Sequence, residues 1–281
     1  MKSLIETLNL GTEYLVRNNI PDARRNMQIL MCSVLNFKNI DLYLNFDRPL
    51  NEIELSELRG KMKELAKHKP IQYVVNSAQF LSFSLELDNN VLIPRPETEE
   101  LVKNILKLIP NRDIRINILD IGTGSGCIAI SLANSLINSK VFAIDISDKA
   151  LEIAEKNAKK YNLKNISFYK MDILKQIPKT KFDIIISNPP YVSDIEYNRL
   201  DKNVLNYEPK IALTDELDGL TYYRRYSNIF PNMLAENGKF YLEIGYGQEE
   251  LIKEIFSVTN FTLKVSKDIY GNSRFLEGNY N

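Results

Sequence analysis

The sequence predicts an α/β protein: a small helical bundle, a β-hairpin, and then a domain built on a mostly parallel seven-stranded sheet. From about residue 97 onward, apolar runs with strand character alternate with amphipathic helical stretches. Before residue 70, apolar residues recur at helical spacing instead. Between these halves, Phe83, Leu85 and Leu87 alternate with polar residues, which is typical of a hairpin strand.

The helical part, residues 1–70, contains three amphipathic stretches. They lie around Leu4, Leu8 and Leu15, at ARRNMQILMCSVL after Pro21 and Asp22, and from Glu52 to Lys67. Residues 71–92 are the predicted linking hairpin, and residues 93–281 are the predicted sheet domain. Its strands are expected at RINILDIG, KVFAIDIS, NISFYKMD, FDIIISN, GKFYLEIG and two final runs, with helices between them.

Composition limits the classes of function. Lysine plus arginine and aspartate plus glutamate number 36 each, so the net charge is zero and we expect no direct nucleic-acid binding. The single histidine, His68, argues against Ser-His-Asp catalysis. Cys32 and Cys127 are too few for a disulfide framework or a zinc site, which predicts a cytoplasmic protein without metal. No signal peptide or membrane-spanning run is expected.

A glycine-rich loop follows the first predicted strand of the sheet domain. In ILDIGTGSGCIAI, Asp120 ends the strand, and Gly122 to Gly126 leads into a helix. Ligands of open α/β sheets bind beyond the carboxyl ends of the strands. The spacing differs from the dinucleotide fingerprint G-x-G-x-x-G, and Asp120 would repel a pyrophosphate. S-adenosyl-L-methionine is cationic and has no phosphate, so we expect this cofactor; a purely structural turn is the alternative.

Acidic residues also follow the next two predicted strands. Asp145 lies 19 residues beyond Gly126, where a carboxylate can accept hydrogen bonds from both ribose hydroxyls. Capping of the following helix is the alternative, but Ser147 and Asp148 are better placed for that. Asp172 could accept from an adenine amine or could be an ordinary loop acid.

The strand FDIIISN ends in Asn188-Pro189-Pro190-Tyr191. Two prolines fix two φ angles and supply no N–H donor, so a stiff turn that ends the strand is one interpretation. The other is a set of site residues at the carboxyl edge of the sheet.

In this order, the glycine loop, Asp145 and NPPY resemble the class I S-adenosylmethionine-dependent methyltransferases, whose fold is Rossmann-like. VLIPRPETEELV, Val91 to Val102, resembles the signature of the HemK/PrmC family, the protein-(glutamine-N5) methyltransferases of peptide chain release factors. NPPY alone is shared with enzymes that methylate adenine or guanine amines. Other matching segments are DAR at Asp22, PIQYV at Pro70, EPKIAL at Glu208, DGL at Asp218 and LEIGYGQ at Leu242.

The resemblance implies a monomeric enzyme that methylates N5 of the glutamine in the GGQ motif of release factors, a step in translation termination. The helical part, residues 1–70, would help bind this protein substrate. The implied catalytic and substrate-binding residues are Asn188, Pro189, Pro190 and Tyr191. The implied cofactor-binding residues are Gly122, Thr123, Gly124, Ser125, Gly126, Asp145, Asp172, Ile173 and Asn188.

A chemical role for NPPY follows from the weak nucleophilicity of an amide. The nitrogen lone pair of glutamine is delocalised, and it reacts only if both N–H groups are held while the lone pair faces the methyl group. The Asn188 side-chain oxygen and the Pro189 carbonyl are the expected acceptors, and the Tyr191 ring would stack on the planar amide. Catalysis can then rest on alignment and hydrogen bonds without a histidine base.

Two segments depart from the family pattern. Asn76 or a neighbour stands where a glycine is usual after QYV, and Thr214 to Leu217 replaces glycines before DGL. Arg95 and Glu97 have two interpretations, a structural turn or a wall of the cofactor pocket. The alternative functions are a nucleic-acid base N-methyltransferase and a non-enzymatic binding protein with an inherited fold; the glycine spacing disfavours a nicotinamide dehydrogenase.

Overall fold

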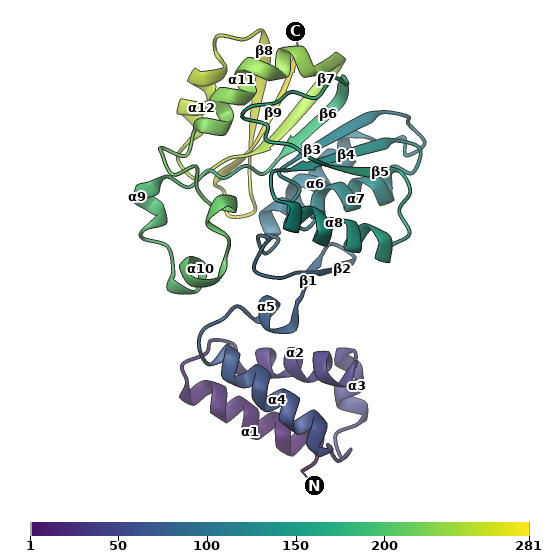
Figure 1. The fold of residues 1–281 in the computed structure, drawn as a ribbon, viewed down its shortest axis with the longest axis vertical. Coiled ribbons are helices and arrows are strands. Elements are labelled where there is room, and N and C mark those ends of the chain that lie inside the picture. The colour runs from purple at the N-terminus through teal and green to yellow at the C-terminus, as the bar shows by residue number, and fades with distance from the viewer. Residues whose placement is uncertain (1, 281) are drawn as a thin grey trace. The chain divides into compact units, whose positions relative to one another are not determined.

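The computed structural model describes residues 2–280, which fall into two compact units, one ending at Ser77 and one beginning at Ala78 (Figure 1). Each unit has its own apolar core. The first contains α1 (Leu4–Arg17), α2 (Ala23–Leu35), α3 (Asn39–Leu44), α4 (Glu52–Leu65) and α5 (Ile71–Val75).

Local sequence signals explain the ends of the longer helices of this unit. Ser3 caps α1 in a reciprocal capping box with Glu6, and Asn51 does the same for α4 with Glu54. The apolar faces of these helices meet in a core that includes the predicted leucines of α1. These contacts account for a helical bundle at the start of the chain.

The segment after Pro70 differs from the predicted hairpin. Ile71–Val75 forms α5 because the Pro70 carbonyl accepts hydrogen bonds from the N–H groups of Tyr73 and Val74. Asn76 then ends the helix at φ 53°, a left-handed conformation that asparagine tolerates well. The hairpin itself is limited to β1 (Ser77–Phe80) and β2 (Phe83–Glu86). Asn76 therefore supplies the left-handed residue that ends α5 and precedes the hairpin.

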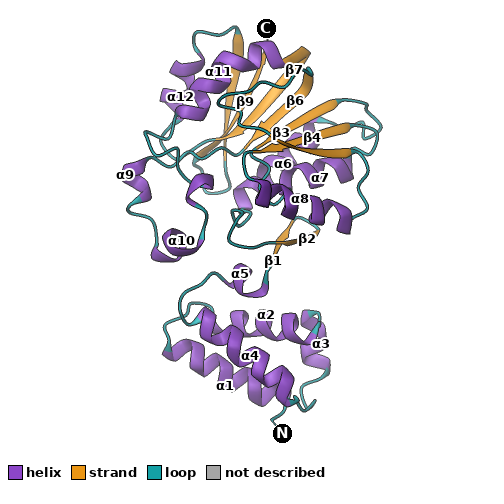
Figure 2. Cartoon of the chain, in the orientation of Figure 1, coloured by secondary structure: helices purple, strands orange, loops and turns teal. Residues whose placement is uncertain are grey.

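The second unit is a mixed seven-stranded sheet with helices on both faces, which confirms the predicted fold class (Figure 2). The strand order is β5-β4-β3-β6-β7-β9-β8. The first five strands in this order are parallel, and β9 is antiparallel to both of its neighbours, β7 and β8. The strands are β3 (Asn117–Ile121), β4 (Lys140–Asp145), β5 (Ile166–Lys170), β6 (Phe182–Ser187), β7 (Leu234–Glu243), β8 (Phe261–Lys267) and β9 (Ser273–Tyr280). The helices are α6 (Pro96–Leu108), α7 (Cys127–Ser135), α8 (Asp148–Lys160), α9 (Asp194–Tyr197), α10 (Lys202–Tyr207), α11 (Thr221–Met233) and α12 (Glu249–Phe256), with a 3-10 turn at Lys210–Ala212.

Strand register places the predicted site residues side by side. Ile121 of β3 pairs with Ile144 of β4 on one side and with Ser187 of β6 on the other. Because these strands are parallel, the next residue of each chain segment emerges at the same edge of the sheet. Gly122, Asp145 and Asn188 are those residues. From β3 the strand order proceeds through β4 to β5 on one side, and β6 and β7 follow on the other side. Ligands of open α/β sheets bind where the strand order reverses in this way.

Candidate active site

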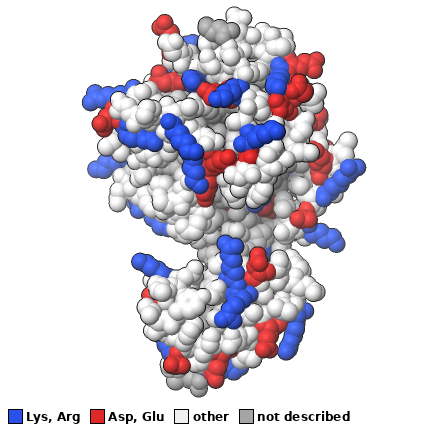
Figure 3. Space-filling view, turned by 180° about the vertical axis from the view of Figure 1, so that it is seen from behind, with Lys and Arg blue, Asp and Glu red and all other residues white. Residues whose placement is uncertain are grey.

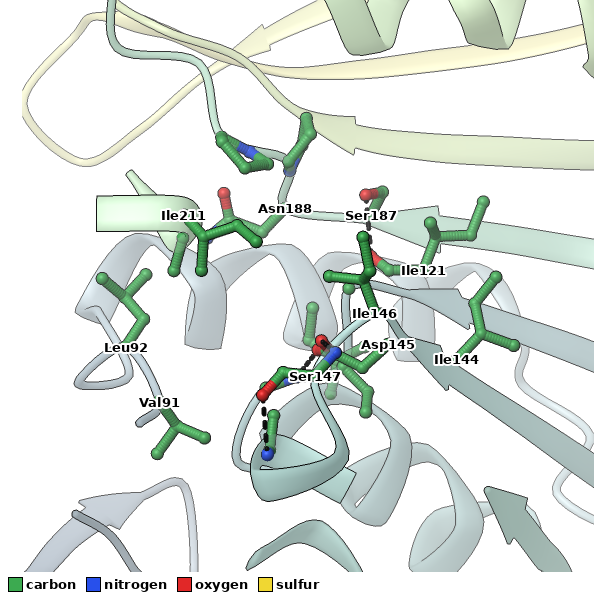
Figure 4. A pocket seen from close by; sticks show the side chains of 18 of the residues that line it. Val91, Leu92, Ile121, Ile144, Asp145, Ile146, Ser147, Ser187, Asn188 and Ile211 are labelled. Carbon is green, nitrogen blue, oxygen red and sulfur yellow. Dashed lines mark hydrogen bonds between the residues drawn. The ribbon is translucent and has the colours of Figure 1, made fainter. Parts of the chain in front are cut away.

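A cavity with an empty volume of about 1010 Å³ lies at this edge of the sheet (Figure 4). Ten of the residues predicted from the sequence line it: Gly122, Thr123, Gly124, Ser125, Asp145, Asp172, Ile173, Asn188, Pro189 and Pro190. Two others do not. Gly126 caps α7 at φ 83°, where an added Cβ would meet Ile130 and Ala154. Tyr191 lines a second cavity instead. The structure thus brings most of the predicted set together.

The glycine loop forms the floor of the first cavity. The N–H groups of Gly122 and Thr123 both donate to the Ile144 carbonyl, at 2.9 and 3.0 Å, which fixes the loop to β4. Gly122 and Gly124 have φ of 73° and 55°, and a Cβ on either would project into open space. This open space is available to a ligand that approaches the backbone closely.

Asp145 is held against this loop by two backbone donors. Its Oδ2 accepts from the Gly124 N–H and its Oδ1 from the Ser147 N–H, both at 2.9 Å. Burial raises the pKa of Asp145 above the ordinary range, although these bonds favour the charged form. Each carboxylate oxygen keeps a further lone pair, so the group can still accept from a ligand hydroxyl. Ser147 is the side chain that caps α8.

Asp172 and Ile173 lie beyond the end of β5. Asp172 Oδ1 accepts from the Leu174 N–H at 3.0 Å, and its other oxygen pairs with Lys175 at 3.1 Å. Ile173 is buried and adds apolar surface to the cavity wall. Tyr222 of α11 lines the same cavity and was not marked by any sequence motif. An adenine ring would therefore meet an isoleucine and a tyrosine.

The cavity suits a cationic nucleoside better than a dinucleotide. Among the described residues that line it, Arg95 is the single cationic side chain. Arg95 is already paired with the buried carboxylate of Glu208, at 2.6 Å. No free cation therefore faces the cavity from the described residues, so none of their side chains would offset the negative charge of a pyrophosphate. S-adenosylmethionine, with its apolar and hydroxyl-bearing parts and its positive sulfur, fits these residues.

A second cavity, with an empty volume of about 1020 Å³, adjoins the first. Asn188, Pro189, Leu92 and Arg95 line both cavities, whereas Tyr191, Gly245, Gln248 and Arg274 line only the second. The NPPY motif therefore forms part of a wall shared by two spaces. Such a wall can present one molecule to another held on its opposite side.

Side chains from distant segments hold NPPY in place. Asn188 Nδ2 donates to the Thr98 hydroxyl at 3.1 Å, and the Tyr191 hydroxyl donates to Glu243 Oε1 at 3.2 Å. The Tyr191 carbonyl accepts from Gln248 Nε2 at 2.8 Å. Sequence reasoning did not identify Thr98 or Glu243. For Glu243 the sequence does contain a signal, because a carboxylate inside the apolar run FYLEIG is unusual.

The loop that departs from the family pattern also contacts NPPY. Glu216 takes φ 61°, and Asp215 accepts hydrogen bonds from the N–H groups of Leu217 and Gly219. Gly219 has φ 78°, and a Cβ there would lie 2.2 Å from the Tyr191 carbonyl oxygen. The turn is thus built by side-chain hydrogen bonds, with glycine kept only at the close approach.

Residues 2–280 contain neither a metal-binding cluster nor a membrane-spanning helix. No group of three or more His, Cys, Asp and Glu side chains in this range could hold a metal ion. No helix in this range has the length and apolar character that crossing a membrane requires.

Two protein-family models match this chain, one in each compact unit. Residues 6–75 match the family described as PrmC N-terminal domain, and residues 113–273 match the family described as Methyltransferase domain. The release factor glutamine methyltransferase of Flavobacterium psychrophilum is 45% identical over 86% of this chain and 87% of its own. That of Lactococcus lactis is 44% identical over 83% and 86%.

A solved methyltransferase from Pyrococcus furiosus has the same fold, with a TM-score of 0.52 and 17% identity over 82% of this chain and 98% of its own. The sequence relatives are closer, and they cover both units. The chain therefore belongs to the PrmC/HemK family of release factor glutamine methyltransferases, which are S-adenosylmethionine-dependent enzymes.

Proposed function

We propose that this chain methylates the side-chain nitrogen N5 of the glutamine in the GGQ motif of peptide chain release factors. The observation that carries the proposal is the shared wall: Asn188 and Pro189 line both cavities. The first cavity takes S-adenosylmethionine and the second takes the glutamine side chain. The reacting atoms then meet at the carboxyl end of β6.

The residues have distinct roles in this proposal. Asp145 accepts hydrogen bonds from the ribose, and Asp172 with Ile173 contacts the adenine. The Asn188 Oδ1 and the Pro189 carbonyl accept the two N–H groups of the glutamine amide, which turns the nitrogen lone pair towards the cofactor. Bound S-adenosylmethionine supplies a methyl group on a positively charged sulfur; the nitrogen bonds to it as the carbon–sulfur bond breaks, and one amide proton leaves to water.

The helical unit and the cellular setting belong to the same proposal. Residues up to Ser77 bind the release factor outside its GGQ loop, which the match to the PrmC N-terminal domain supports. Because translation termination takes place in the cytoplasm, the enzyme acts there, and it acts as a monomer. Sedimentation of the purified chain tests the last point.

Transfer of a labelled methyl group tests the function. The protein is incubated with labelled S-adenosylmethionine and, in separate reactions, a release factor, the same factor with its GGQ glutamine changed to alanine, total RNA and DNA. Label is expected only in the unaltered factor. Label in nucleic acid alone would reject the proposal in favour of a base N-methyltransferase. On the face drawn in Figure 3, acidic and basic side chains are interspersed, which does not favour nucleic acid.

A further inference from the structure

Glu243 is a buried carboxylate at the end of β7, in the second unit. Its side chain is 1% exposed. Burial raises its pKa to about 6, while hydrogen bonds from Thr98 and Tyr191 and the nearby charge of Arg274 act in the opposite direction. A carboxylate in an apolar strand costs stability unless its bonds are satisfied, so its presence needs a reason other than packing.

Its two oxygens serve two members of NPPY. Oε2 accepts from the Thr98 hydroxyl at 2.7 Å, and Oε1 accepts from the Tyr191 hydroxyl at 3.2 Å. Thr98 in turn accepts from Asn188 Nδ2 at 3.1 Å. One carboxylate on β7 is therefore linked, through a threonine of α6, to the asparagine that ends β6.

The direction of these bonds follows from how many hydrogens each group has. An ionised carboxylate only accepts, so the single hydroxyl hydrogen of Thr98 points to Glu243. The Thr98 oxygen then has only lone pairs left for Asn188, and it selects the amide nitrogen as its partner. The amide oxygen of Asn188 consequently faces away from Thr98. Without the bond to Glu243, the Thr98 hydroxyl could donate or accept and would not distinguish the two ends of the Asn188 amide.

We propose that Glu243 is a positioning residue for methyl transfer: through Thr98 it orients the Asn188 amide with its oxygen as acceptor, and directly it holds the Tyr191 ring. This inference rests on the proposed function, because it assumes that Asn188 accepts a hydrogen bond from the glutamine amide. It adds two residues: Thr98, which lines the first cavity, and Glu243, which lines neither cavity. Their proposed effect is on the geometry of Asn188 and Tyr191.

The matched pair Thr98→Val and Thr98→Ser tests the relay. Valine keeps the shape of threonine and removes the hydroxyl, whereas serine keeps the hydroxyl. We expect Thr98→Val to lower kcat for release-factor methylation about tenfold to hundredfold, the scale of a misplaced reacting group. Thr98→Ser should stay within about threefold of wild type. The Kd for S-adenosylmethionine, measured by calorimetry, should change less than kcat in both variants, because the ribose and adenine contacts are elsewhere.

Glu243→Gln supplies the second measurement. In a glutamine, one of the two oxygens that accept from Thr98 and Tyr191 is replaced by an NH2 group, which donates instead of accepting. We expect a loss of kcat at least as large as that of Thr98→Val. Ser227→Ala is the control, since it removes another buried hydroxyl, bonded to the Arg224 carbonyl of α11. It should leave kcat within about threefold.

The outcomes separate the two proposals. If wild-type protein does not methylate a release factor, the proposed function fails. If it does, and Thr98→Val keeps the wild-type kcat, the positioning role is wrong. Equal losses in Thr98→Val and Thr98→Ser would also overturn it, because the hydroxyl would then not matter. If Glu243→Gln does not fold, the threonine pair decides alone.

Discussion

The carboxylate of Asp145 accepts a hydrogen bond from the backbone N–H of Gly124, at 2.9 Å. This contact joins the end of β4 to the glycine loop after β3. The acid predicted to bind the ribose therefore also shapes the loop beneath the ligand. Two consequences of its removal are expected together: loss of a hydrogen-bond acceptor and loss of a fixed loop.

Asp145→Ala should weaken S-adenosylmethionine binding by about 1–3 kcal/mol, the cost of removing a charged hydrogen-bond partner. Calorimetric titration measures it. The control is Asp148→Ala, which removes an exposed acid of the same region that pairs with Lys170. This change should leave the affinity almost unaltered, because an exposed ion pair contributes little. Unchanged affinity in Asp145→Ala would remove this residue from the cofactor site.

The glycine at position 219 allows a second, purely steric test. Gly219→Ala would place a methyl group 2.2 Å from the Tyr191 carbonyl oxygen, at a φ of 78° that alanine adopts only with strain. We expect a loss of at least about 1–2 kcal/mol in the free energy of unfolding and a lower kcat, because NPPY must shift. Urea denaturation and initial rates measure the two effects.

Gly60→Ala is the opposite case. Gly60 lies within α4, and an added Cβ meets nothing within 4 Å. This change should stabilise the protein by about 1 kcal/mol, because alanine favours the helix. Equal effects of the two substitutions would mean that the close approach of Gly219 to NPPY is not a constraint.

The sequence allowed prediction of those features that depend on neighbouring residues. Apolar strand patterns and the residues that follow them placed Gly122, Asp145 and Asn188 at one edge of a parallel sheet, and strand register bears this arrangement out. Contacts between distant segments were not accessible in this way. Thr98 and Glu243 lie 145 residues apart in the chain and meet only because α6 packs near β7.

Local alternatives explain the other differences. The apolar run at 71–75 is short enough to be helix or strand, and the bonds to the Pro70 carbonyl decide for α5. The departure from the family pattern at Asn76 is compatible with a sharp turn, because asparagine also adopts a left-handed φ. The short helices α9 and α10 have too few residues to give a periodic pattern.

A third prediction concerns Asp120, which is fully buried beneath the glycine loop and accepts from the Thr123 hydroxyl. Burial raises its pKa from 3.8 to about 7. Between pH 3.8 and about 7, Asp120 is protonated in the folded protein but ionised in the unfolded chain. The free energy of unfolding therefore falls as the pH rises through this range. The total effect is on the order of 4 kcal/mol, and it is constant above about pH 7.

Asp120→Asn should lack this dependence. Urea denaturation of both proteins at several values between about pH 4 and 7 isolates it, because the other acids titrate in both. The variant should gain stability relative to wild type as pH rises. A difference that stays constant over this range would contradict the expected protonation of Asp120.

The role of the helical unit gives a fourth prediction. Every cofactor-site residue lies beyond Ala78, where the second compact unit begins. A fragment starting at Ala78 should bind S-adenosylmethionine but lose most activity on a whole release factor. A short GGQ peptide should be methylated equally by fragment and full chain, since it lacks the surface that the helical unit would bind. Full activity of the fragment on the whole factor would reject a substrate-binding role for the first unit.

The last prediction concerns Asn188. Asn188→Ala should lower kcat by about 10²–10³-fold, the scale seen when one preorganised polar contact to a transition state is removed. Asn188→Asp keeps an acceptor oxygen and should retain partial activity, above the alanine variant. Its carboxylate has no N–H for Thr98, however, and must compete with Glu243 for the single hydroxyl hydrogen of that threonine.

Combining Asn188→Asp with Glu243→Gln should relieve this competition. The glutamine nitrogen introduced at position 243 can donate to Thr98, its oxygen can still accept from Tyr191, and the Thr98 hydrogen becomes free for the aspartate. The relay then runs in the reverse direction with every bond satisfied. We expect the double variant to exceed either single variant in kcat, which a double-mutant cycle measures as a coupling between positions 188 and 243. Simple addition of the two single losses would mean that the two side chains act independently and that Asn188 is oriented by other contacts.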